Sequence, residues 1–133
     1  MFSDNNKIKN SLVILWIFVS LNYIYCDVLS AIDPTYIKAA IDGSTAVEIS
    51  PALLLFGGIL LEIAFSMILV SYFTKPKIGR MINILASILF IIVQLGSLFV
   101  DEPTIYYIFF SIIEIACMSL ICFISLKWRH NEK

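Results

Sequence analysis

Charged residues are scarce in this sequence: only 14% of its 133 residues are Asp, Glu, Lys or Arg, whereas 60% are hydrophobic. A soluble domain of this size has about 25% charged and about 45–50% apolar residues. The net charge is −1 and the nine basic residues do not gather into one patch, which argues against a nucleic-acid partner. This composition predicts an integral membrane protein whose partner is the lipid bilayer, built as a single domain over residues 1–133.

Histidine pairs and Cys-x-x-Cys pairs are also missing, and each absence argues against a class of membrane redox protein. His130 is the only histidine, so a bis-histidine haem site is impossible. The three cysteines form no Cys-x-x-Cys pair, which argues against a thiol oxidoreductase. No phosphate-binding loop, nucleophile elbow or metalloprotease motif is present. We therefore expect no catalytic residue, no metal site, no cofactor and no enzymatic activity.

Four apolar segments are long enough to cross a bilayer, which takes about 20 residues: 12–32, 52–73, 81–100 and 104–126. They predict an all-α fold, an up-down bundle of four transmembrane helices. Eight of the nine basic residues flank the segment ends that would share one side of the membrane. By the positive-inside rule, both termini are expected in the cytoplasm.

The first connection on the outer side is expected to contain a short helix of its own. Asp33-Pro34 combines a good N-cap with a proline suited to the first helical position, and Ser50-Pro51 repeats this combination at the start of the second apolar segment. Apolar side chains within residues 36–41 share one helical face, and the turn pair Asp42-Gly43 follows. This pattern predicts an amphipathic helix at the outer surface, serving as an interfacial anchor or as a lid over an outward-facing cavity.

The second and fourth apolar segments follow the same plan. In each, a proline precedes a central glutamate by 11 residues and a lysine follows it by 13: Pro51, Glu62 and Lys75 in one, Pro103, Glu114 and Lys127 in the other. We expect two repeated helical hairpins of the same orientation. Both glutamates should lie near the bilayer midplane, because 11 helical residues cover ~16 Å.

Three further local features carry expectations about packing. Gly57-Gly58, one turn before Glu62, favours close approach of another helix. Residues 74–80, which include a proline and a glycine, are expected to form a cytoplasmic turn. Trp128 is expected in the aromatic belt at the inner membrane surface.

An ionisable residue inside the hydrocarbon is costly and marks a functional site by default. The candidate proton- or ligand-binding residues are Glu62, Glu114, Asp27, Asn22 and Gln94. No Lys or Arg lies in any apolar segment, so the carboxyls need another source of neutralisation. Protonation, hydrogen bonds to Asn22 or Gln94, a proton shared between the two glutamates, or a bound cation would each serve.

These residues leave three classes of function open. The first is a carrier in which Glu62 and Glu114 exchange protons for a small cation or a lipophilic solute. The second is a structural or accessory membrane protein whose protonated glutamates hold helices together by hydrogen bonds. The third, an enzyme acting on lipid or quinone, lacks the nucleophile or redox centre that it would need. The sequence leaves open whether the bundle works alone or as a homodimer.

The Leu-Leu-Glu-Ile segment at residues 60–63 and the segment Tyr-Tyr-Ile-Phe-Phe-x-x-Ile-Glu-Ile-Ala-Cys at residues 106–117 resemble a known kind of protein. The chain is similar, over nearly its whole length, to bacterial families of small four-helix integral membrane proteins of unknown function. This resemblance implies a multi-pass protein of the bacterial inner membrane. Small multidrug-resistance exporters are also short and depend on a membrane glutamate, but theirs lies in the first helix, where this chain has Asp27.

Overall fold

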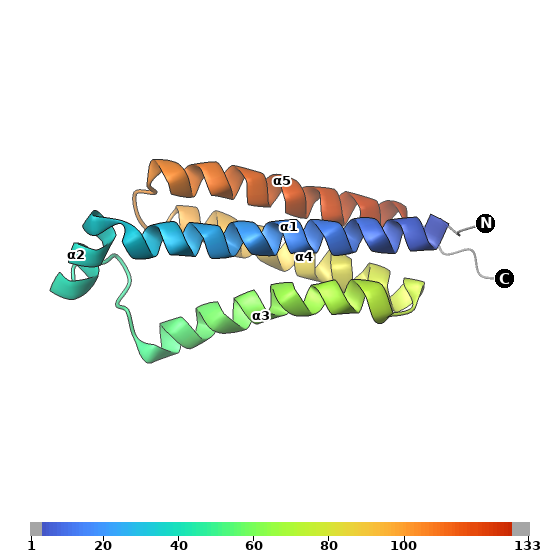
Figure 1. The fold of residues 1–133 in the computed structure, drawn as a ribbon, viewed down its shortest axis with the longest axis horizontal. Helices are drawn as coiled ribbons and strands as arrows, with labels where there is room; N and C mark the ends of the chain where they lie inside the picture. Colours follow the sequence, from blue (N-terminus) through green and yellow to red (C-terminus); the bar gives the residue numbers. More distant parts are fainter. Residues whose placement is uncertain (1–3, 129–133) are drawn as a thin grey trace.

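The computed structural model describes residues 4–128, which form five helices and no strand. In chain order the helices are α1 (Asp4–Ile32), α2 (Pro34–Asp42), α3 (Pro51–Phe73), α4 (Pro76–Leu98) and α5 (Ile105–Lys127) (Figure 1). All except α2 are long and apolar enough to cross a membrane. The four apolar segments are therefore confirmed as helices. Arg129, His130 and Lys133 lie outside the described residues.

Local sequence sets the starts of α2 and α3 as predicted. The Asp33 carboxylate accepts a hydrogen bond from the backbone N–H of Thr35 at 3.0 Å, and Pro34 begins α2. The Ser50 hydroxyl caps α3 in the same way, and Pro51 is its first residue. Gly43 ends α2 with a φ of +68°, a left-handed conformation that glycine adopts without steric cost.

Two helices begin earlier than the sequence predicted. α1 starts at Asp4 and not at residue 12, and α4 starts at Pro76 and not at residue 81. The expected turn over residues 74–80 is wrong for most of its length, because Pro76 occupies the first turn of α4, where its missing N–H costs nothing. Gly79 then lies on the helix and is buried, with no room for a Cβ beside the Thr74 hydroxyl.

Trp128 does not face lipid as an aromatic belt would, so that expectation is wrong. Its ring is buried, at 1% exposure, and lies 3.6 Å from the point where a Cβ on Gly79 would be. Its indole N–H donates to the Asn5 side-chain carbonyl at 2.8 Å. A tryptophan whose N–H has a partner can be buried at little cost, and here it closes one end of the bundle.

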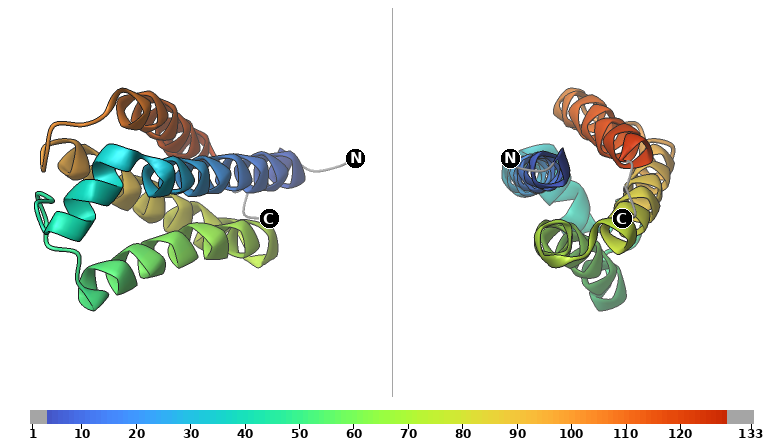
Figure 2. Two further views of the ribbon diagram at one scale, coloured as in Figure 1. Left: turned by 60° about the vertical axis from the view of Figure 1, so that its left-hand side comes forward. Right: turned by 90° about the vertical axis from the view of Figure 1, so that its right-hand side faces the viewer.

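α1 packs against both α3 and α5, and α5 packs against α4, whereas α3 makes few contacts with α4. The start of α1 and the end of α5 lie at one end of the molecule, which we call the Trp128 end (Figure 1). α2 and the start of α3 lie at the opposite end, which we call the α2 end. Figures 1 and 2 show α3 leaning away from the other helices toward the α2 end.

The apolar core is concentrated toward the Trp128 end, because α3 leans away from the other helices toward the α2 end (Figures 1 and 2). α3 contributes Ala64, Met67 and Ser71 as its buried residues, and every residue from Pro51 to Ile59 is exposed. Trp16 of α1 packs edge-on against Phe90 of α4, with ring centroids 5.8 Å apart. The four long helices are therefore packed together between this aromatic pair and the Trp128 end, whereas α3 is separated from the others toward the α2 end.

Candidate functional site: a carboxyl in a cavity between four helices

The Glu114 carboxyl lies inside the bundle, on the face of α5 that packs against α1 and α4. Its side chain is 2% exposed, and its Oε1 atom has no hydrogen-bond partner within residues 4–128. Buried polar groups in proteins are nearly always hydrogen-bonded, and each exception asks for an explanation. Glu114 is such an exception, and it lies beside a cavity.

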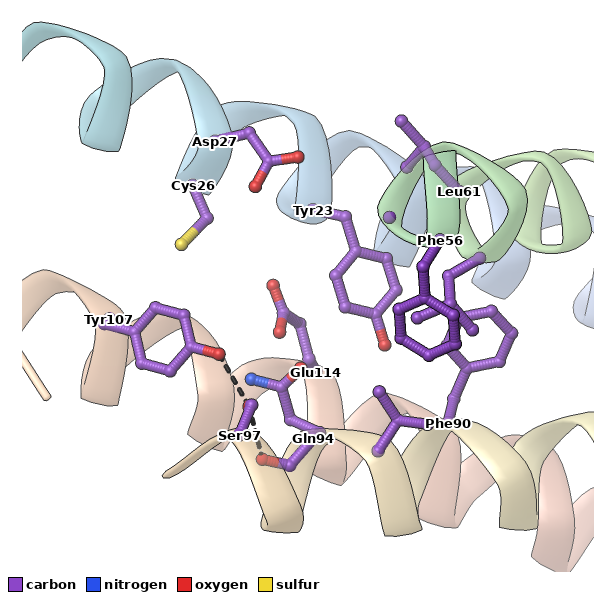
Figure 3. A pocket seen from close by; sticks show the side chains of 13 residues that line it. Tyr23, Cys26, Asp27, Phe56, Leu61, Phe90, Gln94, Ser97, Tyr107 and Glu114 are labelled. Carbon is purple, nitrogen blue, oxygen red and sulfur yellow. Dashed lines mark hydrogen bonds between the residues drawn. The ribbon is translucent and has the colours of Figure 1, made fainter. Parts of the chain in front are cut away.

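This cavity, which we call the Glu114 cavity, has a volume of about 320 Å³ and is bordered by all four long helices. In Figure 3 the Glu114 carboxyl occupies the space between side chains of α1 and Gln94 of α4. None of the lining residues is basic. They are Tyr23, Cys26, Asp27, Phe56, Gly57, Leu60, Leu61, Phe90, Val93, Gln94, Ser97, Tyr107 and Glu114.

The α1 wall supplies a second carboxyl. Asp27 and Tyr23 are one helical turn apart and both line the cavity, as their spacing predicts (Figure 3). The Tyr23 hydroxyl is buried without a hydrogen-bond partner among the described residues. Asp27 is exposed, so it lies at the rim. The wall thus offers one free hydroxyl inside the cavity and one carboxylate at its opening.

The α4 and α5 walls are held in place by hydrogen bonds between their own polar side chains. The Gln94 amide donates to the Ser111 hydroxyl at 2.6 Å, and Gln94 is 8% exposed. The Ser97 and Tyr107 hydroxyls are 2.6 Å apart and share a hydrogen bond (Figure 3). These two links fix the side of the cavity that carries Glu114, while Glu114 itself takes no part in them.

The α3 wall is the loose one. It is formed by residues from the half of α3 that leans outward, including Phe56, which is 55% exposed. Gly57 also lines the cavity, and a Cβ there would meet nothing within 4 Å. Neither Gly57 nor Gly58 packs against another helix of the chain, so the close approach that this pair favours does not occur within residues 4–128.

A second hollow, of about 440 Å³, adjoins the Glu114 cavity toward the α2 end. The two share Asp27, Ser97 and Tyr107 in their walls. The second hollow also includes Asp101 and Glu102 from the connection between α4 and α5. The wall that the two hollows share therefore contains the Asp27 carboxyl and the Ser97–Tyr107 hydrogen bond, and the second hollow adds two further carboxyls.

Glu62 is not part of this site, although its local sequence nearly matches that of Glu114. Its side chain is exposed on the outer surface of α3 and does not line the cavity. The proline anchors of the proposed repeat also differ, because Pro51 is the first residue of α3 whereas Pro103 precedes Thr104, the N-cap of α5. Within one chain, the structure does not bring the two glutamates into one site.

Asn22 is also separate from the cavity. Its amide donates to the backbone carbonyl of Phe18, one turn earlier in α1, at 2.8 Å. Of the five candidate residues, the structure therefore brings together Glu114, Asp27 and Gln94. Tyr23, Ser97 and Tyr107 join them; Tyr23 follows from its spacing to Asp27, but nothing in the local sequence directs the other two toward Glu114.

Cys26 lines the cavity with Asp27 and Glu114, so three groups that bind metals in other proteins border the same space. Within residues 4–128, however, no three His, Cys, Asp or Glu side chains are arranged to hold a metal ion. The side chains around the cavity supply carboxyls, hydroxyls, a thiol, an amide, aromatic rings and aliphatic groups.

No curated protein and no solved structure matches the chain. One family model does match, and it spans residues 1–133. The chain belongs to DUF6326, a family of unknown function.

Proposed function

We propose that this protein is a multi-pass protein of the bacterial inner membrane whose Glu114 cavity binds a small or lipophilic cationic solute in exchange for a proton. The observation that carries the proposal is the Glu114 carboxyl, buried at 2% exposure, unpartnered at Oε1 among the described residues, and bordering a cavity of about 320 Å³. Ligand pockets in proteins typically have volumes of about 300–1,000 Å³. The cavity is at the small end of this range.

The exchange of a proton for a cation follows from the free-energy cost of an uncompensated charge on Glu114. In the empty cavity the Glu114 carboxyl is neutral, because a bare carboxylate in apolar surroundings costs far more than holding a proton. A bound cation supplies the missing positive charge, so the carboxyl releases its proton to water as the cation binds. One proton leaves for each positive charge that takes its place.

The walls favour a cation that carries apolar groups. Four aromatic side chains, Tyr23, Phe56, Phe90 and Tyr107, border the cavity together with the two carboxyls. Aromatic faces attract cations, and the attraction strengthens where water is excluded. An anion would find no basic side chain among the lining residues.

The direction of access is part of the same proposal. Lys9 reaches the Tyr72 carbonyl, and Arg80 reaches the Ser125 and Leu126 carbonyls, so basic residues gather at the Trp128 end. This supports an up-down arrangement with both termini cytoplasmic and the α2 end outside. The carboxylate-lined hollow beside Asp27 then opens outward. The relation of the two hairpins as a repeat of the same orientation is also part of this proposal.

The alternative is a structural or accessory membrane protein, also without enzymatic activity. The hydrogen bond from Gln94 to Ser111 favours it, because this bond joins α4 to α5 directly beside Glu114. In that case Glu114 is a protonated packing group and the cavity is filled by lipid. The two functions differ in whether a cation changes the chemistry of Glu114.

Carbodiimide labelling distinguishes them, because dicyclohexylcarbodiimide modifies protonated carboxyls in apolar surroundings. Purified protein in lipid vesicles would be labelled with and without tetraphenylphosphonium, ethidium or tetrapropylammonium, and the modified residues located by mass spectrometry. We expect at least one cation to reduce labelling at Glu114 severalfold. Glu62, which does not line the cavity, is the internal control, and whatever its labelling is, the cation should leave it unchanged.

Glu114→Gln should abolish the labelling at residue 114 that the cation reduces, and it should abolish binding of that cation. The proposal is wrong if none of the three cations protects Glu114, if Glu62 is protected to the same extent, or if Glu114→Gln binds the cation as the unmodified protein does.

A further inference from the structure

α3 has an exposed face, with a glutamate on it, that does not line the Glu114 cavity. The side chains opposite its packed face follow one another at intervals of three or four residues, which places them on one side of a helix. All are exposed. We call this surface the Glu62 face: Leu55, Gly58, Glu62, Ser66 and Leu69.

Glu62 lies in the middle of this face without a partner. Within residues 4–128 it makes no hydrogen bond and no ion pair, and its neighbours Leu55 and Leu69 are 65% and 61% exposed. α3 has the composition and length of a membrane-spanning helix. A lone carboxyl facing lipid tails finds neither donor nor acceptor, which is costly even when it is protonated.

The same face is shaped for a close neighbour. α3 is the least covered long helix: 11% of its most apolar stretch is buried, against 39% for α5. A Cβ on Gly58 would meet nothing within 4 Å, and Ser66 stands one turn beyond Glu62 on the other side. Small residues one turn from a polar residue are typical of contacts between membrane helices, because they let the two backbones approach.

We infer that the Glu62 face is a contact surface between two copies of this chain, with α3 packed on α3 and the two Glu62 carboxyls hydrogen-bonded to each other. A protonated carboxyl has one donor and one acceptor, so an identical carboxyl satisfies both at once. Two copies inserted in the same direction are related by a two-fold axis along the membrane normal. Such an axis through this face brings each residue opposite its own counterpart, at equal depth.

This contact is independent of the Glu114 cavity. Gly57 lines the cavity and Gly58 lies on the Glu62 face, so the two surfaces occupy different sides of α3. The cavity can bind a cation in a single chain, and two chains can associate without any ligand. Failure of one proposal would leave the other standing.

Cysteine cross-linking in vesicles of purified protein tests the contact. Cys26, Cys117 and Cys122 would be replaced by alanine, and Ser66→Cys would be compared with Ile112→Cys. Ile112 lies on α5 and is 65% exposed, so it is an equally accessible position outside the Glu62 face. Under mild oxidation we expect Ser66→Cys to give mainly the disulfide-linked dimer and Ile112→Cys to remain mainly monomeric.

A second measurement uses the chain with its cysteines intact. Energy transfer between two fluorophore-labelled populations should show a dimer that Glu62→Leu weakens about tenfold, corresponding to ~1.4 kcal/mol. Glu62→Gln, whose amide can still pair with its counterpart, should weaken it less. Equal cross-linking at Ser66 and Ile112, or a monomer in the energy-transfer measurement, would show that lipid covers this face and would overturn the inference. An unchanged dimer in Glu62→Leu would overturn it as well.

Discussion

Asn83 of α4 and Glu114 of α5 are both buried polar side chains in apolar helices, but they lie in different halves of the bundle and differ in their hydrogen bonds. The Asn83 side chain is fully buried; its carbonyl accepts from the Trp16 indole at 2.7 Å and the Ser71 hydroxyl at 3.1 Å. Its amide donates to the Gly79 backbone carbonyl at 2.8 Å. Glu114 has an unpartnered oxygen beside a cavity.

The difference separates a polar group that holds helices together from one that we propose binds a ligand. Asn83 joins α1, α3 and α4 where they are close together, and a satisfied buried network makes a core rigid and specific. Glu114 lies in the half where α3 leans away from the other helices (Figure 2), and no group within residues 4–128 makes a hydrogen bond to its Oε1 atom. The open half is therefore the half in which a ligand could complete the hydrogen bonds.

The largest effect on stability should come from the satisfied group. Asn83→Leu leaves the Trp16 N–H and the Ser71 hydroxyl without their acceptor, and we expect it to lower the free energy of unfolding by about 2–3 kcal/mol. Reversible unfolding in mixed micelles measures this. Asn22→Leu is the matched control, since Asn22 bonds only within its own helix, and it should change stability by less than about 0.5 kcal/mol. If the two variants lost the same free energy of unfolding, Asn83 would be no more important to stability than Asn22.

Glu114→Leu should behave in the opposite way. The carboxyl has an unpartnered oxygen, and an apolar side chain of similar size fits the apolar wall, so we expect the variant to be as stable as the parent or more stable by about 1 kcal/mol. The same unfolding experiment applies, with Glu114→Gln beside it. If Glu114→Leu destabilises as strongly as Asn83→Leu, both halves use polar groups as structural links and the comparison fails.

Filling the cavity should sharpen the comparison without disturbing the core. Gly57→Leu projects a side chain into the Glu114 cavity from a position where a Cβ meets nothing within 4 Å. We expect carbodiimide labelling at Glu114 to fall severalfold while the helix content stays the same. Gly58→Leu adds the same group to the adjacent residue outside the cavity, and Glu114 should be labelled as in the parent. Equal loss in both variants would mean that the lower labelling does not come from filling the cavity.

The smallest effect concerns the attachment of α2. The Tyr106 hydroxyl donates to the Asp33 carboxylate at 2.9 Å, and this hydrogen bond lowers the pKa of Asp33. A lowered pKa in the folded protein contributes stability above the ordinary aspartate range, and that contribution is lost as the pH falls through the folded pKa. Tyr106→Phe should therefore be slightly less stable than the parent at about pH 7, and the difference should disappear as the pH falls through the lowered pKa of Asp33. A difference in melting temperature that persists at the lower pH would show that the hydroxyl acts by packing alone.

Much of the fold follows from short stretches of sequence. Apolar runs of spanning length predict the four long helices, and Asp33-Pro34 and Ser50-Pro51 predict where α2 and α3 begin. Caps and first-turn prolines act within one helical turn, so they can be recognised without tertiary information. The early starts of α1 and α4 were missed because residues 4–11 and 76–80 are polar or contain Pro and Gly. Their helical state depends on contacts at the Trp128 end, such as those of Asn5 and Gly79 with Trp128.

The candidate site was only partly predictable. The shortage of charge inside the helices identified Asp27, Gln94 and Glu114 as unusual, and these three border the cavity. Asn22 was equally unusual, but it bonds to its own helix. Ser97 and Tyr107 are ordinary residues in sequence, and they matter because the packing of α4 on α5 places their hydroxyls 2.6 Å apart.

Glu62 and Glu114 show which properties local sequence determines and which depend on tertiary packing. Their flanking residues are almost the same, and each sequence by itself determined a long apolar helix with one central carboxyl. Only the packing of the helices decided that Glu114 is buried at 2% exposure while Glu62 faces outward. These helices are apolar on every side, so no amphipathic pattern sets their rotation. The rotation is set by contacts with neighbouring helices: α5 packs against both α1 and α4, whereas residues 51–59 of α3 are all exposed.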